Sequence, residues 1–466
     1  MGITRSSQAN RPYSHSLRFI VALTALVVVF HLFVEAAAAV PEQPSHVYIE
    51  GRELIVERRL EDGSLTDAES YVIHGITWTP ATRAPKDGPN PLNPSEAVPY
   101  GFFIDWANRD PQGNVLFVHW LRAEHQRHYR VDVPLMKMMN VNTVRLYIDF
   151  GDNPDTYKEI LDVFYRNDIM VIMMVASSKN DIDARRYENI VNICKGHPAI
   201  LMWNIGNEWN LDYNKYWGYE TVEEAARATN SVAEKIKKLD GAHPVASCLG
   251  DRFMDDEPSN TIKDVVDMCA DVDIWGLNIY RGKSFRNLFL QWSAITDKPM
   301  YLSEFGIDSF KTTAYTKADG ARVAFCKGSQ DRDTQAEYDL SLWSEIGDNL
   351  SAYDPEKVCV GGTIHSFNDC LWKVGCYHAS LGGLIDYDDP VEGVSYKTYN
   401  NEGFYLPDGA QDGILNEEHF GVMDADRNPK KAFLVLRDLY EVMHNKQARG
   451  KRIKNVGRLH AIPSQD

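Results

Sequence analysis

The chain has 466 residues, of which 44% are hydrophobic and 25% are charged. This is the balance of a globular protein, with enough apolar material for a large core. The formal net charge of −17 at pH 7 repels phosphate backbones, so we expect no nucleic-acid partner.

Residues 1–39 have the order of a secretory signal. Arg5, Arg11 and Arg18 precede the apolar run 19–34, and small residues follow at 36–39. One interpretation is a cleaved signal peptide. Because the apolar run could nearly span a bilayer, the other is an uncleaved signal anchor that attaches the chain to a membrane. In either case we expect export, as a secreted protein or as a single-pass protein with a lumenal or extracellular body.

The cysteines fit an exported protein loosely. Cys370 and Cys376 are close enough in sequence to form a disulfide within one loop, whereas Cys248 and Cys359 lie in strand-like runs and are expected to be buried thiols. Asn349 begins an N-glycosylation sequon, which predicts a glycoprotein. No cluster of His and Cys has the spacing of a zinc site, so we expect no metal or other cofactor.

After the leader, the pattern divides the chain into three further parts. Residues 40–68 read as a short N-terminal hairpin and linker around Gly51 and a turn at 61–63. Residues 69–445 alternate short apolar strands with helical stretches, and the basic tail 446–466 reads as a solvated end. The expected strands are Tyr71–Ile76, Thr143–Tyr147, Met170–Val175, Ile200–Ile205, Pro244–Cys248, Ile274–Ile279, Met300–Ser303 and Val358–Ile364.

Helical patterns lie between these strands. They cover Asp155–Arg166, Asp183–Lys195, Val222–Leu239 and Thr334–Leu350, and a last helix is expected at Pro429–Met443. Alternating strands and helices imply parallel pairing, and eight such units predict a closed (β/α)8 TIM barrel. A doubly wound open sheet is the alternative, but no glycine-rich phosphate motif follows the first strand.

Long loops follow the first, seventh and eighth strands. They run from Thr77 to about Glu124, over Phe305–Arg332 and over Ser366–Asn428. In a barrel, the loops after the strands build the face where substrate binds. The insertions are therefore expected beside the active site.

Two glutamates stand at the carboxyl ends of opposite strands of this barrel. Glu208 follows the fourth strand, and Glu304 follows the seventh. A lone Glu208 could be the cap of the following helix, but here both carboxylates would point into one pocket. Two carboxylates across a sugar ring are what glycosidic cleavage requires, with a short separation for retention and a wider one for inversion.

The pair and its neighbours resemble the clan A retaining glycoside hydrolases. The resemblance rests on Asn207-Glu208, on Ser303-Glu304-Phe305-Gly306 and on segments 132–136, 142–145 and 417–421. It is closest to the TIM-barrel catalytic domain of family 2, with similarity to families 5 and 72, over most of residues 71–443.

The resemblance implies a role for each matching residue. Glu208 would be the acid/base and Glu304 the nucleophile, while Asn207 would bind the sugar 2-hydroxyl. Arg145 would keep Glu304 ionised, and Tyr280 would donate a hydrogen bond to it. From the residues alone, Arg145 could instead be a salt bridge at the barrel mouth, and Tyr280 a packing aromatic.

Aromatic residues gather in the loops of the predicted binding face. Trp209, Trp217 and Trp372 are candidates for stacking on sugar rings, although each could also anchor its loop. Many clan A barrels carry a Trp after strand eight, and Phe367 is expected at that position here. The smaller ring would alter the site that binds the reactive sugar.

These features predict a retaining glycoside hydrolase that cleaves or transglycosylates a β-linked oligo- or polysaccharide, in carbohydrate metabolism or in the remodelling of cell-wall glycans. The alternative is a non-catalytic glycan-binding barrel at the cell surface, for which the change after strand eight is the argument.

Overall fold

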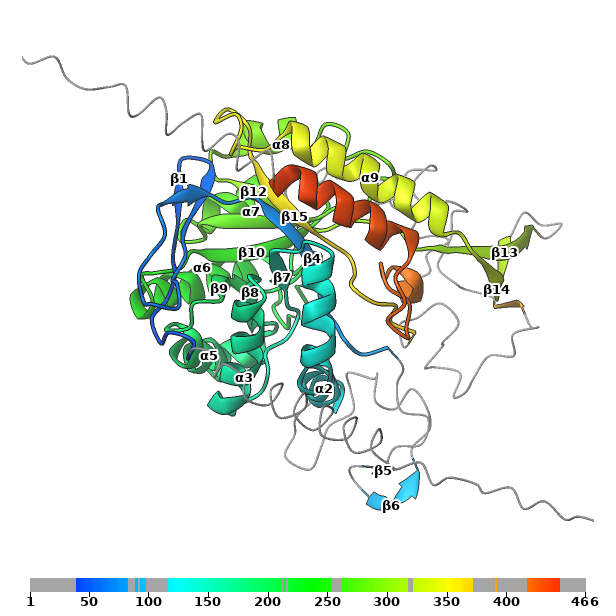
Figure 1. Ribbon diagram of the computed structural model, residues 1–466, viewed down its shortest axis with the longest axis horizontal. Helices are drawn as coiled ribbons and strands as arrows, with labels where there is room; N and C mark the ends of the chain where they lie inside the picture. The colour runs from blue at the N-terminus through cyan, green and yellow to red at the C-terminus, as the bar shows by residue number, and fades with distance from the viewer. Residues whose placement is uncertain are drawn as a thin grey trace, which may run out of the picture. The chain divides into compact units, whose positions relative to one another are not determined.

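Eight parallel strands close into a barrel in the computed structural model (Figure 1). The residues that the structure describes are 39–82, 89–90, 93–97, 116–211, 213–214, 217–252, 262–316, 322–371, 390–391 and 417–444. The barrel strands are β4 (Ile73–Thr77), β7 (Thr143–Arg145), β8 (Met170–Ala176), β9 (Ile200–Ile205), β10 (Val245–Gly250), β11 (Ile274–Asn278), β12 (Met300–Glu304) and β15 (Cys359–Ile364). Each pairs with the next, and β15 pairs with β4 to close the ring. The predicted (β/α)8 barrel is confirmed.

Helices surround the barrel. They are α2 (Leu116–Met138), α3 (Pro154–Arg166), α4 (Lys179–Asp183), α5 (Arg186–Cys194), α6 (Val222–Leu239), α7 (Ile262–Met268), α8 (Leu288–Ile295), α9 (Arg332–Asp348) and a final helix at 431–444. Polar caps fix where several of them begin: the side chains of Asn153, Thr221 and Asp331 accept hydrogen bonds from the first turns of α3, α6 and α9. The final helix lies beside α9, where Trp343 packs edge-on against Tyr440.

The N-terminal hairpin packs on the end of the barrel where the strands begin. Strands β1 (His46–Glu50) and β2 (Glu53–Glu57) are antiparallel, and the short β3 (Glu69–Ser70) adds to their sheet. Val47 and Leu54 join a buried apolar cluster with Ile73, Met170 and Ile274, which open three barrel strands. The long loops follow the strands and therefore lie at the opposite end of the barrel, where the strands finish.

The loops differ from the sequence expectation in two places. The segment after the first strand was expected to be irregular to about Glu124, but α2 already begins at Leu116. The segment after the seventh strand forms the hairpin of β13 (Phe310–Thr316) and β14 (Arg322–Gln330), which extends away from the barrel in Figure 1. β16 (Pro390–Val391) pairs with β14, and β5 (Pro89–Asn90) pairs with β6 (Asn93–Ala97). Pattern reasoning treated this segment as a loop and missed the hairpin, although its pairing is local and runs from Thr316↔Arg322 to Phe310↔Gln330.

Five cysteines are free thiols in the structure: Cys194, Cys248, Cys269, Cys359 and Cys370. Cys248 and Cys359 are buried thiols, as predicted, and Cys194 and Cys269 are also buried. Cys376, the expected partner of Cys370, lies outside the described residues, so that disulfide stays a prediction. Glycosylation of Asn349 also stays a prediction. Its Nδ2 donates a hydrogen bond to the carbonyl of Glu345 at the end of α9.

Among the described residues, no helix has both the length and the apolar character needed to cross a membrane. The predicted signal or anchor at 1–39 lies almost wholly outside them, as does the basic tail 446–466.

Candidate active site

Glu304 is the last residue of β12 and stands at the carboxyl end of the barrel. Its side chain is largely buried. Arg145 Nη1 donates to Glu304 Oε1 at 2.9 Å, and the hydroxyl of Tyr280 donates to Oε2 at 3.0 Å. Both hydrogen bonds favour the ionised carboxylate, so Glu304 is placed to act as an anion.

A tight turn after β9 carries Glu208 to the same end of the barrel. Gly206 and Glu208 both have positive φ angles, 75° and 49°. A Cβ at Gly206 would lie 2.1 Å from Trp217 Cζ2 and 2.8 Å from Trp209 Cδ1. Only glycine fits against the two rings with this backbone angle, so the packing of the rings fixes the turn that holds Glu208.

Asn207 joins Asn278 to Arg145, and through Arg145 to Glu304, in a hydrogen-bond network. Its Oδ1 accepts from Arg145 Nη2 at 2.5 Å and from Asn278 Nδ2 at 3.1 Å. Ser303 donates to Asn278 Oδ1 at 2.6 Å, which fixes the orientation of that amide. With its oxygen occupied twice, Asn207 turns its own NH₂ group away from Arg145 and keeps it as a donor.

The two glutamates have unequal environments. Burial, and then the nearby charge of Glu304, raise the pKa of Glu208 to about 8, although a hydrogen bond from Asn278 and the charge of Arg145 act in the opposite direction. Glu304 has an arginine bound directly to its carboxylate. The arrangement therefore keeps a proton on Glu208 near neutral pH beside an anionic Glu304.

Sequence reasoning missed Tyr147 and His365. Burial, and then the charge of Glu304, raise the pKa of Tyr147, and its hydroxyl lies 3.0 Å from His365 Nδ1. The alternation of side chains along a strand could have found Tyr147, because it lies two residues after Arg145 and on the same face.

The prediction for strand eight was wrong. Phe367 is fully buried, and its backbone bonds to Thr77 and Met423 hold it in the core between loops. His365 is the residue after β15 that contacts the site, and its ring lies near those of Tyr147 and Phe420.

The two loop tryptophans are also not where we expected them. Trp209 is fully buried and Trp217 is 2% exposed, so neither presents a ring face to a sugar. Trp209 donates to Ser247 Oγ at 2.9 Å, and the two rings pack on each other. Both support the Gly206–Glu208 turn from inside the protein. Trp372 lies outside the described residues, so its role as a sugar platform stays a prediction.

We expect Gly206→Ala to destabilise the protein by about 2–5 kcal/mol, because it combines an unfavourable φ with overpacking. Any folded variant should also lose activity, because the turn holds Glu208. Urea unfolding of the variant and of Gly241→Ala makes the comparison, since a Cβ at Gly241 meets nothing within 4 Å. Equal unfolding free energies for the two variants would contradict this account of the turn.

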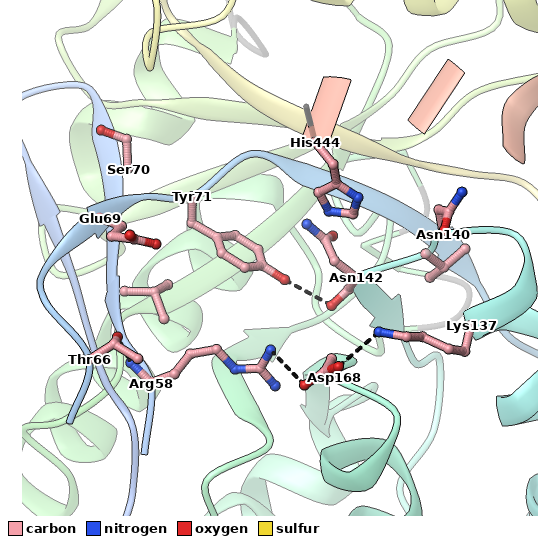
Figure 2. A pocket seen from close by; sticks show the side chains of 12 residues that line it. Arg58, Thr66, Glu69, Ser70, Tyr71, Lys137, Asn140, Asn142, Asp168 and His444 are labelled. Carbon is pink, nitrogen blue, oxygen red and sulfur yellow. Dashed lines mark hydrogen bonds and ion pairs between the residues drawn. The ribbon is translucent and has the colours of Figure 1, made fainter. Parts of the chain in front are cut away.

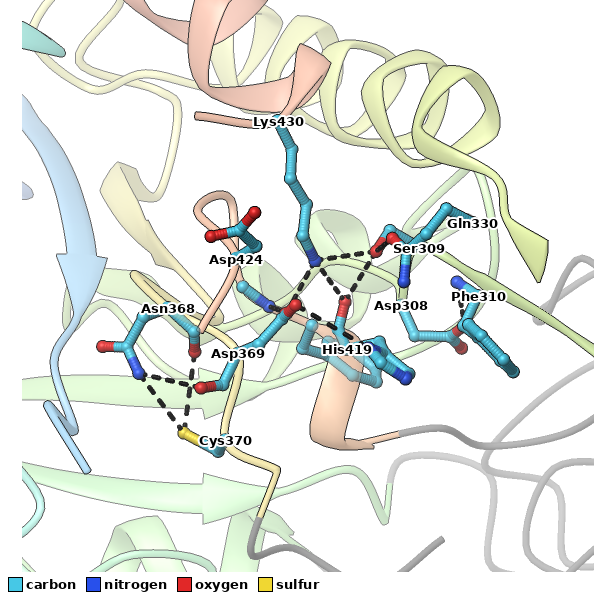
Figure 3. A network of polar contacts seen from close by, with 12 residues as sticks. Asp308, Ser309, Phe310, Gln330, Asn368, Asp369, Cys370, His419, Asp424 and Lys430 are labelled. Carbon is cyan, nitrogen blue, oxygen red and sulfur yellow. Dashed lines mark hydrogen bonds and ion pairs between the residues drawn. The ribbon is translucent and has the colours of Figure 1, made fainter. Parts of the chain in front are cut away.

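A buried lysine connects the loops that follow β12 and β15 (Figure 3). Lys430 Nζ lies 2.6 Å from Asp369 Oδ1, 2.7 Å from Ser309 Oγ and 3.1 Å from the carbonyl of His419. His419 ends the 3₁₀ turn η4 (Glu417–His419), and the next residue, Phe420, packs edge-on against Tyr280. The network therefore holds in place a segment that contacts a hydrogen-bond donor of Glu304.

We expect Lys430→Met to lower the free energy of unfolding by about 3–5 kcal/mol, because it leaves the buried Asp369 without its cation. The matched control is Lys431→Met, which breaks the exposed Lys431–Asp333 pair and should cost about 0–1 kcal/mol. Chemical denaturation of both variants tests the contrast. A loss below about 1 kcal/mol for Lys430→Met would mean that this pair does not hold the loops.

A hollow lies at the other end of the barrel, where the strands begin (Figure 2). It has a volume of about 280 Å³ and is lined by residues that precede β4, β7 and β8 and by His444. Arg58 and Lys137 both pair with Asp168 there, at 3.6 and 2.9 Å. Its charges balance, and active sites of such barrels lie at the opposite end, where the strands finish, so we assign it no function. No group of three potential metal ligands lies within the described part of the chain.

Part of the chain matches a known family. Residues 173–320 match the model of the TIM barrel domain of family 2 glycosyl hydrolases, and this segment contains Asn207, Glu208 and Glu304. The match covers about a third of the chain and indicates a barrel similar to that of family 2 over this segment.

Solved structures with a similar arrangement include three bacterial enzymes. The β-glucuronidase of Ruminococcus gnavus has 16% identity and a TM-score of 0.46 over 85% of this chain and 53% of its own. A putative β-galactosidase of Bacteroides fragilis has 15% identity and a TM-score of 0.46 over 85% and 45%. A β-glucuronidase of Bacteroides uniformis has 14% identity and a TM-score of 0.44 over 83% and 40%. The chain spans about half the length of these proteins or less. The sugar specificities in their names are those of the named proteins.

Proposed function

We propose that this chain is a retaining β-glycosidase that works by double displacement. Glu304 attacks the anomeric carbon of a β-linked sugar, and the glycosidic C–O bond breaks as Glu208 gives its proton to the leaving oxygen. Water then attacks the same carbon, Glu208 takes a proton from it, and the bond to Glu304 breaks. If a sugar hydroxyl replaces water in the second step, the result is transglycosylation.

The observation that carries the proposal is the inequality of the two glutamates. A nucleophile must be ionised, and Arg145 and Tyr280 both favour an anion at Glu304. An acid must hold a proton at working pH, and burial and the neighbouring charge raise the pKa of Glu208. Asn207, held by Arg145 and Asn278, supplies a donor for the sugar 2-hydroxyl. A non-catalytic binding barrel has no need of this inequality.

Covalent labelling tests the proposal. A panel of 2-deoxy-2-fluoro-β-glycosyl fluorides of common hexoses should yield one reagent that adds a single glycosyl unit, and peptide mapping should place it on Glu304. NMR of early products should then show the β-anomer. Turnover without labelling, with α-anomer as first product, would indicate inversion. Neither turnover nor labelling on the whole panel would favour the glycan-binding barrel.

We also propose that the body of the protein acts outside the cytosol, secreted or anchored through residues 19–34. The order of positive, apolar and small residues in 1–39 supports this. N-terminal sequencing of the protein from its native membrane and medium fractions distinguishes the forms. A mature start near residue 40 in the medium means secretion, and an intact leader in the membrane fraction means an anchor. An intact leader in the cytosol would contradict both.

A further inference from the structure

The peptide that precedes Glu304 lies where the sheet is irregular. Opposite β11, Leu302 pairs with Leu277 and Glu304 pairs with Asn278, so Ser303 is an extra residue in β12 at this shift of register. An extra residue interrupts the backbone ladder, and such irregularities near active sites re-aim the side chains that follow them. Side chains can therefore control the orientation of the peptide between Ser303 and Glu304.

Two side-chain donors bind the carbonyl of Ser303. Thr363 of β15 donates from Oγ1 at 2.6 Å, and Arg145 donates from Nη1 at 3.2 Å. The carbonyl of Leu302 is 3.5 Å from the threonine oxygen, so the single hydroxyl proton is directed to Ser303. Arg145 Nη1 also donates to Glu304 Oε1 at 2.9 Å. The two donors thus hold the peptide before Glu304, and Arg145 holds its carboxylate as well.

The methyl group of Thr363 fixes the direction of its hydroxyl. Thr363 is fully buried and pairs with Gly75 of β4. A Cβ at Gly75 would lie 2.4 Å from Thr363 Cγ2, so the methyl group fills the space that a side chain would take there. A β-branched side chain has few χ1 rotamers. With its methyl group over Gly75, Thr363 keeps Oγ1 directed toward β12.

The hydroxyl could serve only to satisfy a buried carbonyl. Ser303 O already accepts from Arg145, however, so the carbonyl has a partner without the threonine. We propose that Thr363 is a positioning residue for the nucleophile: its hydroxyl fixes the peptide between Ser303 and Glu304 and so aims the Glu304 carboxylate at the anomeric carbon. This inference rests on the proposed nucleophilic role of Glu304.

The kinetics of fluorosugar labelling test the aim of the carboxylate. Thr363→Val keeps the methyl group over Gly75 but puts a carbon where the donor was. Carbon–oxygen contacts are about 3.3 Å or longer, so the peptide must move. We expect the first-order rate constant of labelling at Glu304 to fall about 10²-fold, with the dissociation constant of the fluorosugar within about threefold of wild type.

Two further variants separate the lost donor from crowding. Thr363→Ser keeps the hydroxyl and should recover most of the labelling rate. Thr363→Ala removes the donor without crowding the carbonyl and should slow labelling about tenfold, the effect of one hydrogen bond. A serine variant as slow as Thr363→Val would overturn the proposal. So would a weaker fluorosugar affinity with an unchanged rate constant, since that would mean a role in binding substrate.

The matched control is Thr143→Val. Thr143 is a fully buried threonine of β7 at the end of the barrel where the strands begin, and its hydroxyl donates to Asn142 Oδ1 at 2.8 Å. The variant loses a buried hydrogen bond far from the nucleophile, so labelling should be unchanged. Equal slowing in Thr143→Val and Thr363→Val would mean a general loss of structure and would overturn the proposal.

NMR observes the peptide without any substrate. Ser-Glu occurs only at 95–96, 303–304 and 344–345, so protein labelled with carbonyl-¹³C serine and ¹⁵N glutamate has three such correlations, and Ser303→Ala identifies the one of interest. This signal should shift in Thr363→Val and Thr363→Ala and stay in place in Thr143→Val. An unshifted signal in the Thr363 variants would overturn the proposal. Absence of labelling at Glu304 in the wild type would instead reject the nucleophile assignment, while the shift still reports the contact.

Discussion

Replacing Glu304 by Gln should lower kcat by about 10⁴-fold or more, since removing a nucleophile costs this order in other enzymes. Gln has nearly the same shape but no anionic oxygen to attack the anomeric carbon. The measurement is turnover of the best substrate from the panel, together with fluorosugar labelling, which should disappear. A residual rate within tenfold of wild type would remove Glu304 from the mechanism.

The shorter variant Glu304→Ala separates loss of chemistry from loss of structure. It leaves space where the carboxylate stood, so added azide can attack an activated β-glycoside directly and give the α-glycosyl azide. Recovery of this product would show that substrate still binds and that the rest of the site still supports displacement at the anomeric carbon. The variant should also be less stable than wild type, because the fully buried Arg145 loses an ion-pair partner at 2.9 Å.

The sequence predicted the strands and the residues at their ends better than the loops. Strand β9 has the expected bounds Ile200–Ile205, because apolar runs bounded by polar residues define buried parallel strands. The period-2 alternation and the order of the strands then bring Arg145, Asn207 and Glu304 to one end of the barrel. The positions of these residues follow from local sequence patterns and from the order of strands in a closed barrel, so they can be predicted from the sequence.

Which side chains of the loops are buried and which face the site could not be predicted from such patterns. Trp209 and Trp217 looked like sugar platforms, but their rings meet over Gly206, whose lack of a side chain makes room for them. Likewise, whether His365 or Phe367 faces the site depends on how the chain bends after β15. Such contacts arise between distant loops, and neither propensity nor spacing specifies them.

Replacing Glu208 by Gln should change activity and stability in opposite directions. Without a proton donor, kcat/KM should fall about 10²–10⁴-fold on alkyl or sugar leaving groups. The loss should be much smaller for aryl leaving groups that depart without a proton. Comparing nitrophenyl and methyl β-glycosides of the same sugar tests this. Equal losses for both would mean that Glu208 does not act as the acid.

The pH dependence follows from the raised pKa of Glu208. The basic limb of kcat/KM in the wild type should fall near pH 8, where the acid loses its proton, and it should be absent in Glu208→Gln.

The raised pKa of Glu208 also destabilises the folded wild type. Between the usual value of 4.5 and about 8, the folded protein keeps a proton that the unfolded chain releases, so stability falls as pH rises through this window. Glu208→Gln removes that cost, so the inactive variant should melt at a higher temperature than wild type at pH 7–8 and at about the same temperature near pH 4. A higher melting temperature confined to neutral pH, together with the loss of the basic limb, would link the raised pKa and the catalytic acid to one side chain.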